Sequence, residues 1–378
     1  MQRISLILFI SVTLSICKTE IPESFATDNQ LQTNMDSVVH RTAIKLMDDR
    51  MIGLSLGIYK NGEISFYNYG SIEKNKQVLP TRNTIYEIGS ITKTFTGILL
   101  AQAVQENKLS LNDDIRLYLD PKFDNLEYGG DPIRIVNLAN HTSGLPEDFI
   151  PEEFFKLENP TMFDIIHLYD KDRGELFLND LEKTKPDTLP GQRIVYSNAG
   201  MITLGIILEN IYGISYPELI IKYFAGPMSM KNTETVFYKS ETDNYTKGYD
   251  KDGNVMPHIT FQIAGAAGGL KSTTGDMILF IKENLTDINK VVKLAHKSTI
   301  AKNGQELGLG WQISKSNSGE KQLWHDGGEP GFSSYIAIVP GMKTGIICLT
   351  NQRGRQYLLS NLSSEILSGI KNNHFQEH

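Results

Sequence analysis

The stretch EIGSITK, residues 87–93, stands directly before an apolar run over residues 95–104 that has the length of a helix. It places the Ser90 hydroxyl three residues before the Lys93 amine, and residues three apart share one face of a helix. A lysine held against apolar surface near the positive end of a helix loses part of its preference for the charged form, and can accept a serine proton. Backbone N–H groups at the same helix start can bind an oxyanion. The stretch therefore predicts an activated serine nucleophile at the entrance to a helix.

The pattern Ser-x-x-Lys is not specific by itself, because the chain contains it five times, beginning at Ser15, Ser71, Ser90, Ser318 and Ser368. Only the copy at Ser90 opens a long helical run. The other four lie in an N-terminal leader, a charged turn, a polar loop and a helix end. The structural alternative for Ser90 is an N-cap serine followed by a solvated lysine. The choice between the two depends on the rest of the chain.

A second element is Tyr196-Ser197-Asn198, which stands just before a helical run over residues 201–211. A phenol is not basic at neutral pH unless cations lower its pKa, so a tyrosine at this place makes chemical sense with Lys93 nearby. Another Tyr-x-Asn, at residues 59–61, precedes Gly62 between two alternating apolar stretches and predicts a hairpin turn. The copy at Tyr196 is the candidate for chemistry.

A third element is the strand-like HDGG, residues 325–328, which supplies glycines that let a substrate lie against the backbone. A literal Lys-Thr-Gly exists at residues 343–345. It follows a Pro-Gly pair and separates two apolar runs, 335–339 and 346–349, so it predicts a hairpin turn away from the site. The sequence thus favours His325 over Lys343 as the cleft residue.

Together these elements resemble the motif set of serine β-lactamases and penicillin-binding proteins, in particular the branch of class C β-lactamases, serine D-peptidases and related esterases. Residues 138–146 and 267–273 resemble two further loops of the family in order and spacing. The resemblance covers nearly the whole chain after the leader. It implies that Ser90 is the nucleophile and that Lys93 and Tyr196 share proton transfer, with either of the two as the base.

The same resemblance implies substrate-binding roles. Asn198 would bind the acyl side chain, and the backbone N–H groups of Ser90 and Gly328 would form the oxyanion hole, with Gly327 beside them. His325 and Asp326 depart from the strongest β-lactamase pattern, which has a lysine and then a hydroxyl residue. Histidine is mostly neutral at pH 7 and an aspartate repels an anion, so efficient penicillin hydrolysis is not expected. His-x-Gly variants are typical of D-peptidases and esterases in this family.

We therefore expect a serine hydrolase that forms an acyl-enzyme on an amide or ester of a small substrate. A D-peptidase similar to a D-Ala carboxypeptidase, or an esterase, is favoured; a true β-lactamase is one alternative. A covalent penicillin-binding sensor that acylates without turnover is another, since its sequence would look the same. The expected partners are cell-wall D-peptides, β-lactams or small esters.

The other patterns in the sequence do not predict a further catalytic or cofactor site. The string ELFLN, residues 175–179, matches a β-lactamase water-activating motif but precedes Tyr196 and has an ordinary amphipathic helix pattern. His141, in a loop, is expected to organise backbone by hydrogen bonds. The histidines are scattered, no metal-ligand spacing is present, and no phosphate-binding loop precedes a helix, so we expect neither metal nor cofactor. A net charge of −7 with mixed signs gives no electrostatic case for nucleic acid.

The N-terminus predicts export. Residues 1–17 have a basic start at Arg3 and an apolar run over residues 4–16, which is typical of a secretion signal and short for a membrane span. Residues 14–17 also approach a lipoprotein cleavage box, with Cys17 as the attachment site for a lipid; simple cleavage after Cys17 is the alternative. We expect a secreted or periplasmic protein, or a membrane-anchored lipoprotein. After such a leader Cys348 has no cysteine to pair with.

For the fold we expect an α/β (α+β) architecture with an antiparallel sheet flanked by helices. A helix over residues 34–50 and a hairpin over 54–69 precede the nucleophile, and strands over 322–325, 334–339 and 345–350 precede a closing helix over 357–370. Both ends of the chain can thus share one sheet. The expected organisation is a single catalytic domain, 18–378, with sheet parts at about 30–105 and 245–378 and a mostly helical insertion at about 106–244.

Overall fold

The structure is a computed structural model that describes residues 25–48, 51–150, 156–157, 173–235, 244–259, 263–286 and 288–373. The expected leader over residues 1–17 and the expected lipid attachment at Cys17 lie outside these residues.

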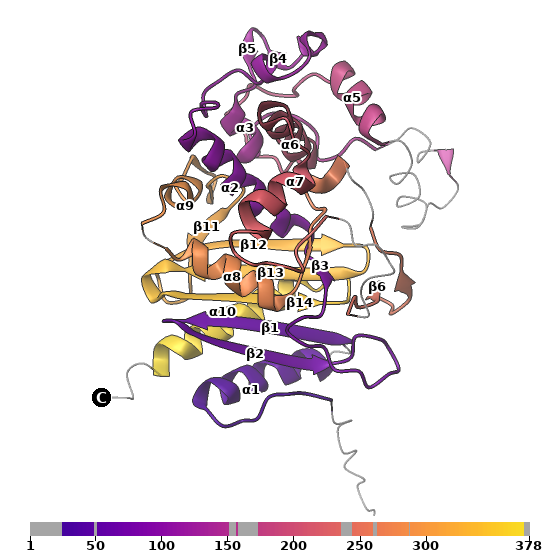
Figure 1. Ribbon diagram of the computed structural model, residues 1–378, viewed down its shortest axis with the longest axis vertical. Helices are drawn as coiled ribbons and strands as arrows, with labels where there is room; N and C mark the ends of the chain where they lie inside the picture. Colours follow the sequence, from indigo (N-terminus) through magenta and orange to yellow (C-terminus); the bar gives the residue numbers. More distant parts are fainter. Residues whose placement is uncertain are drawn as a thin grey trace, which may run out of the picture.

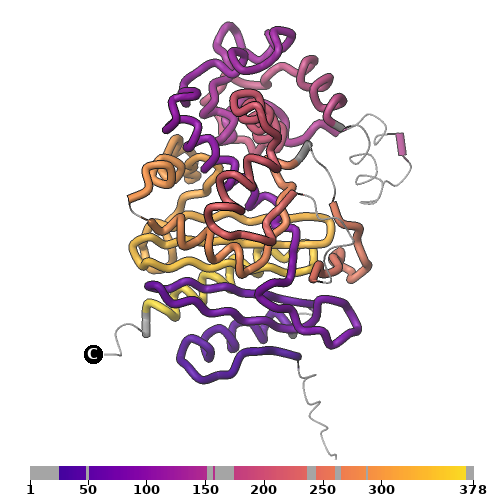
Figure 2. Tube along the Cα trace, in the orientation of Figure 1, coloured from indigo at the N-terminus to yellow at the C-terminus, as the bar shows by residue number. Residues whose placement is uncertain are grey.

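An eight-stranded sheet runs through the described part of the chain, in the order β2-β1-β14-β13-β12-β11-β10-β9, and every pair in it is antiparallel. Its strands are β1 (Gly53–Lys60), β2 (Glu63–Gly70), β9 (Ile300–Lys302), β10 (Gln305–Leu307), β11 (Gln312–Lys315), β12 (Lys321–Glu329), β13 (Phe332–Val339) and β14 (Thr344–Thr350). β1 pairs with β14 from Leu54 opposite Thr350 to Lys60 opposite Thr344. Figure 2 shows these indigo and yellow segments side by side. The prediction that both ends of the chain share one sheet is confirmed.

Both faces of this sheet are covered. In β13, Ile336 and Ile338 belong to the core that includes α2 (Thr92–Gln105) and α8 (Thr274–Asn284), whereas Tyr335 and Val339 belong to a second core under α1 (Asn34–Asp48) and α10 (Gln356–Asn373). Figure 1 shows α1 and α10 on one side of the strands and α8 on the other. A strand that is buried on both faces reads as a continuous apolar run, as β13 and β14 do.

Mostly helical structure lies between α2 and the later strands. It contains α3 (Ile135–Ala139), α5 (Arg173–Lys183), α6 (Asn198–Tyr212) and α7 (Tyr216–Ile220), with the short turns η2 (Ile115–Tyr118) and η3 (Pro121–Phe123) and the hairpin β4 (Glu127–Tyr128) and β5 (Asp131–Pro132). In Figure 1 this part forms the upper half of the molecule. The expected antiparallel sheet flanked by helices is confirmed, while the division into sheet parts and insertion stays a prediction.

The remaining described elements are shorter: β3 (Tyr86–Glu87), the π-helical η5 (Ile221–Ala225), β6 (Gly248–Tyr249), β7 (Val255–Met256), η6 (Ile263–Ala266), β8 (Lys271–Ser272), α9 (Lys290–Ala295) and η7 (Pro340–Met342). Among the described helices, none by itself is long and apolar enough to cross a membrane. Only α6 with the helix that follows it, Tyr216–Ala225, passes a test of length and composition as a pair, and the pair is bent by 76°.

The local predictions about turns agree with this fold. Asn61 and Gly62 form the β1–β2 turn with φ of 52° and 100°, as a tight hairpin of this twist requires. Lys343 follows η7 in the turn between β13 and β14, so the literal Lys-Thr-Gly is hairpin sequence as predicted. Glu175 is exposed on α5 while Phe177 is buried, which confirms the amphipathic reading of that segment.

Candidate active site

Ser90 lies in the one-turn helix η1 (Gly89–Ile91), and α2 begins two residues later, at Thr92. The helix thus starts slightly later than predicted, but the spacing still brings the two side chains together, with Lys93 Nζ 3.0 Å from Ser90 Oγ. Lys93 is completely buried and donates a second hydrogen bond of 2.6 Å to the Ala267 carbonyl oxygen. Burial lowers the pKa of Lys93 to about 7, against the opposing effect of nearby carboxylates. A lysine in this state is neutral in about half of the molecules at pH 7 and can take a proton.

Tyr196, from the second motif, also contacts Ser90 Oγ. Its phenol donates a 2.6 Å hydrogen bond to Ser90 Oγ, and its ring centroid lies 4.8 Å from Lys93 Nζ. The loop is fixed at this place because Ser197 caps α6, accepting a hydrogen bond from the Gly200 N–H. Burial raises the pKa of Tyr196, with the neighbouring carboxylates adding to the effect. The expectation that Lys93 lowers this pKa is therefore wrong, since desolvation of the phenolate exceeds the effect of a lysine that is itself only partly charged.

His141 supports the tyrosine loop. Its ring Nδ1 accepts a hydrogen bond of 3.2 Å from the Ser197 N–H, and its ring centroid lies 4.7 Å from that of Tyr196. Burial lowers the pKa of His141 far below its usual value, so the ring is neutral. The predicted structural role is confirmed.

Asn198 is the first residue of α6, two residues after Tyr196. Its backbone N–H donates to the Glu147 carbonyl oxygen at 2.8 Å, and its side-chain Nδ2 donates to Asp148 Oδ2 at 3.1 Å. These contacts tie the start of α6 to Glu147 and Asp148, which directly follow the segment 138–146 that resembles a family loop. The side chain of Asn198 therefore has a fixed direction and an acidic neighbour.

His325 comes from β12 and is 2% exposed. It pairs with Ile336, whose side chain belongs to the α2 core, so His325 lies on the same face of the sheet as Lys93. Its Nδ1 is 2.7 Å from the Asp326 carbonyl oxygen, and burial lowers the pKa of His325 to about 4. The ring is neutral and donates through Nδ1, which leaves Nε2 as an acceptor that has no partner within the described residues.

Asp326 is oriented differently. It pairs with Tyr335, whose side chain belongs to the core under α1 and α10, so the carboxylate of Asp326 is on the opposite face of the sheet from His325. Its negative charge nevertheless raises the pKa values of Lys93 and Tyr196 across the strand. Any repulsion of an anion by Asp326 thus acts through the strand rather than by direct contact.

The glycines let the nucleophile turn pack against β12. A Cβ atom on Gly327 would clash with the Ile88 carbonyl oxygen and the Ser334 hydroxyl, and one on Gly89 would lie 2.9 Å from the Gly328 nitrogen. Only glycine permits this approach of two backbones. β11 pairs with residues 321–324 of β12 and no further, so within the described part of the chain residues 325–329 form an open strand edge beside Ser90. The expected oxyanion donors therefore lie in adjacent backbones.

Two groups near Ser90 were not predicted from the sequence. One is the Ala267 carbonyl, which fixes the Lys93 amine; the loop over residues 267–273 had been noted, but a backbone acceptor leaves no signature in the sequence. The other is Glu329, four residues after His325 and so on the same face of β12. The spacing of four residues between His325 and Glu329 in a predicted strand could have placed both side chains on one face. Burial, and then the charge of Glu87, raise the pKa of Glu329 to about 8.

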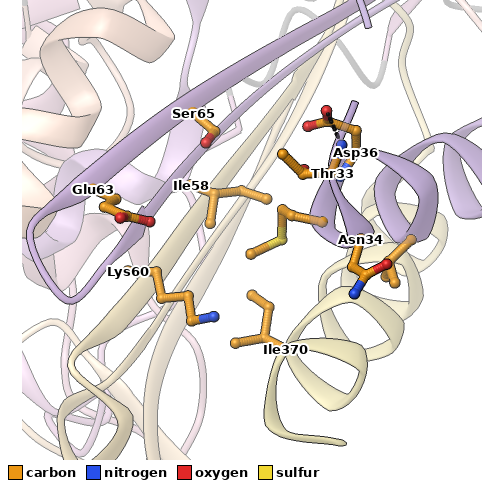
Figure 3. Close-up of a pocket in the computed structure, with 10 residues that line it drawn as sticks. Thr33, Asn34, Asp36, Ile58, Lys60, Glu63, Ser65 and Ile370 are labelled. Atoms are coloured by element: carbon orange, nitrogen blue, oxygen red, sulfur yellow. Dashed lines mark hydrogen bonds between the residues drawn. The ribbon is translucent and has the colours of Figure 1, made fainter. Parts of the chain in front are cut away.

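Two other features lie outside this site. Among the described residues, no group of three or more histidine, cysteine, aspartate and glutamate side chains is placed to hold a metal ion. A cavity of about 270 Å³ lies between α1, the β1–β2 hairpin and α10, lined by residues that include Met35, Ile58, Lys60 and Ile370. Figure 3 shows Ile58, Lys60 and Ile370 around it. It contains none of the predicted site residues.

Comparison with known sequences agrees with the resemblance. A model of the Beta-lactamase family matches residues 39–362. A β-lactamase of Pseudomonas fluorescens is 26% identical over 362 residues, which cover 85% of this chain and 94% of the relative. The protein flp of Staphylococcus aureus (strain MW2) is 29% identical over 359 residues, which cover 90% of this chain and 67% of the relative.

Solved structures with the same fold include a β-lactamase/D-alanine carboxypeptidase from Pseudomonas syringae, with a TM-score of 0.76 and 22% identity, covering 89% of this chain and 99% of the other. An octameric penicillin-binding protein homologue from Pyrococcus abyssi has a TM-score of 0.75 and 26% identity, covering 90% of this chain and 78% of the other. A class C β-lactamase has a TM-score of 0.75 and 24% identity, covering 88% and 96%. Because the family model spans most of the chain, the protein belongs to the Beta-lactamase family and is a serine hydrolase with the fold of class C β-lactamases and penicillin-binding protein homologues.

Proposed function

We propose that the protein hydrolyses an amide or ester of a small substrate through an acyl-enzyme on Ser90, acting as a D-peptidase or an esterase. The observation that carries this proposal is the contact of Ser90 Oγ with two proton-transfer groups, Lys93 Nζ at 3.0 Å and Tyr196 Oη at 2.6 Å. A serine with two such partners is activated for attack on a carbonyl carbon.

The protonation states favour Lys93 as the group that takes the serine proton. Tyr196, whose pKa is raised by burial, stays protonated and donates its hydrogen bond to Ser90 Oγ. The serine proton is then directed to the neutral amine of Lys93. As Ser90 Oγ attacks, Lys93 becomes an ammonium, the carbonyl oxygen becomes an oxyanion near the N–H groups of Ser90 and Gly328, and the phenol of Tyr196 can pass its proton to the leaving group. Lys93 returns a proton to Tyr196, and a water molecule reverses these steps during deacylation.

The state of His325 favours a peptidase or an esterase over a strong β-lactamase. At pH 7 its ring is neutral, so it provides no permanent cation for the carboxylate that a penicillin carries. The fold relative from Pseudomonas syringae is described as both a β-lactamase and a D-alanine carboxypeptidase. We therefore keep β-lactam hydrolysis as a second candidate activity of the same site, and acylation without turnover as a third.

One experiment separates these activities. The mature protein and its Ser90→Ala variant are incubated with a fluorescent penicillin, a chromogenic cephalosporin and a p-nitrophenyl ester, and both adduct mass and product are followed. Steady product that depends on Ser90 supports the hydrolase and ranks its substrates. A stable adduct without product supports the sensor, and product that persists in Ser90→Ala contradicts the proposal.

A further inference from the structure

His141 has an unusual backbone conformation for a buried residue that is not glycine. Its φ is 58°, in the left-handed region, and the residue is 4% exposed. Residues other than glycine are uncommon in this region, because the Cβ atom comes close to the following carbonyl oxygen. Such a conformation persists only where the surroundings hold it, and it is most frequent at active sites and ligand-binding segments. The contacts of His141 indicate what its conformation is for.

Two hydrogen bonds hold His141 to the chain on both sides of Tyr196. The carbonyl oxygen of His141 accepts one of 2.8 Å from the Val195 N–H, and its ring Nδ1 accepts one of 3.2 Å from the Ser197 N–H. The two donors are the residues immediately before and after the tyrosine. A single residue thus fixes the backbone from which the Tyr196 side chain extends.

The imidazole of His141 also contacts the phenol ring itself. The two ring centroids are 4.7 Å apart, and the ring planes are inclined by 40°. This contact limits the rotation of the Tyr196 side chain, whereas the hydrogen bonds limit its backbone. Burial lowers the pKa of His141 far below its usual value, so Nδ1 keeps the lone pair with which it accepts. All three contacts restrain the phenol that donates to Ser90 Oγ at 2.6 Å.

The segments around Tyr196 have anchors of their own. Ser197 caps α6, and its hydroxyl donates a 2.6 Å hydrogen bond to the Pro146 carbonyl oxygen. The Gly191 N–H donates to the Thr142 carbonyl oxygen at 2.8 Å. Neither bond involves the imidazole or the phenol. Removing the imidazole should therefore release the phenol while the loop and α6 keep their fold.

We propose that His141 is the positioning residue of the proton donor: it holds Tyr196 Oη within hydrogen-bond distance of Ser90 Oγ, ready to protonate the leaving group. This inference rests on the proposed function, in which Tyr196 passes its proton to the leaving group. His141 itself exchanges no proton and touches no substrate. Its effect on the rate should therefore depend on how much the leaving group needs a proton, and on the presence of the tyrosine hydroxyl.

Three substitutions separate the parts of the contact. His141→Asn removes the ring but keeps an acceptor, since an amide oxygen takes the place of Nδ1 and the new residue tolerates a positive φ. His141→Phe keeps a ring and removes the acceptor, and His141→Ala removes both. His296→Asn is the matched control, because His296 is another buried histidine, hydrogen-bonded to Asn284 and packed against Trp311. Circular dichroism establishes that each variant is folded.

Two esters of one acid measure the effect on acylation. Ethyl butyrate has a leaving group that needs a proton, whereas p-nitrophenolate leaves p-nitrophenyl butyrate without one. We expect His141→Ala to lower kcat/KM at least about tenfold for the ethyl ester and less than about threefold for the p-nitrophenyl ester, with His141→Asn and His141→Phe in between. His296→Asn should change neither by more than about twofold, and nor should His141→Ala when added to Tyr196→Phe.

Crystal structures of the unmodified, His141→Ala and His296→Asn proteins test the placement without turnover. The distance from Tyr196 Oη to Ser90 Oγ should exceed about 3.5 Å only in His141→Ala. A phenol that stays in place in this variant, an unchanged rate for the ethyl ester, or an equal loss for both esters would overturn the inference. A displaced phenol in a protein that hydrolyses neither ester before mutation supports the role of His141 and counts against the proposed esterase activity.

Discussion

The buried Lys93 should lower the free energy of unfolding at neutral pH. Replacing it with methionine should remove this loss of stability. The lysine is completely buried, and its pKa falls from 10.5 to about 7 on folding because burial disfavours the ammonium. Between these two pH values the unfolded chain binds more protons than the folded protein. The stability of the unmodified protein therefore rises with pH across that window, and Lys93→Met removes this dependence.

The size of the effect follows from the two pKa values. The linkage relation gives a cost of about 4 kcal/mol at pH 7 and about 2 kcal/mol at pH 9. Methionine has a similar length and suits an apolar site, but it leaves the Ala267 carbonyl without its donor, which costs about 1–3 kcal/mol. We expect Lys93→Met to be more stable than the unmodified protein by about 1–3 kcal/mol at pH 7. This advantage should shrink by about 2 kcal/mol at pH 9, because the carbonyl cost does not depend on pH.

Urea unfolding followed by fluorescence at pH 7 and pH 9 measures this difference. Lys282→Met, on the exposed side of α8, is the matched control and should show no comparable change with pH. A Lys93→Met advantage that is the same at both pH values, or larger at pH 9, would refute the reasoning that the lysine is neutralised on folding. The variant should also fail to form an acyl-enzyme, because the proton acceptor is gone.

Three further predictions concern activity. Tyr196→Phe should lower the rate of acylation by about 10²–10⁴-fold, since the leaving group loses its proton donor; stopped-flow rates near those of the unmodified enzyme would exclude this role. The kcat/KM of an uncharged ester should rise with pH through about 7 as Lys93 loses its proton, and a flat profile between pH 5 and pH 9 would argue against the amine as base. Lys343→Ala should change ester hydrolysis less than twofold, because Lys343 is exposed in the turn between β13 and β14; a large loss would mean that the third motif had been chosen wrongly.

Much of the fold could be predicted because its signals are local. Asn61-Gly62 between alternating apolar stretches predicts a hairpin, and the apolar runs of β13 and β14 predict buried strands. The pairing of β1 with β14 joins residues almost 300 positions apart. Strand-like runs at both ends of the chain predicted that the two ends share a sheet, but no local pattern specified which strands pair. Short elements such as η1 and β3 were not predicted, since they depend on packing against β12 and β8 more than on their own residues.

The sequence by itself determined which residues are proposed to carry the chemistry. Ser90, Lys93 and Tyr196 could be named because a hydroxyl and an amine at helical spacing, and a phenol before a second helix, explain one another chemically. It also determined that His325 stands where a lysine is usual. These are statements about residue identity and short spacing, which the chain retains whether or not it is folded.

Only the tertiary structure decided the charge state and the direction of the side chains around Ser90. The pKa of Lys93 depends on complete burial and on the opposing charges of Asp148 and Glu329. The direction of its amine depends on the Ala267 carbonyl, 174 residues away. Asp326 is turned from the nucleophile by its pairing with Tyr335, and Glu329 is brought beside Gly268 by the end of β12. Desolvation and strand register arise from residues distant in sequence, so no local pattern contains them.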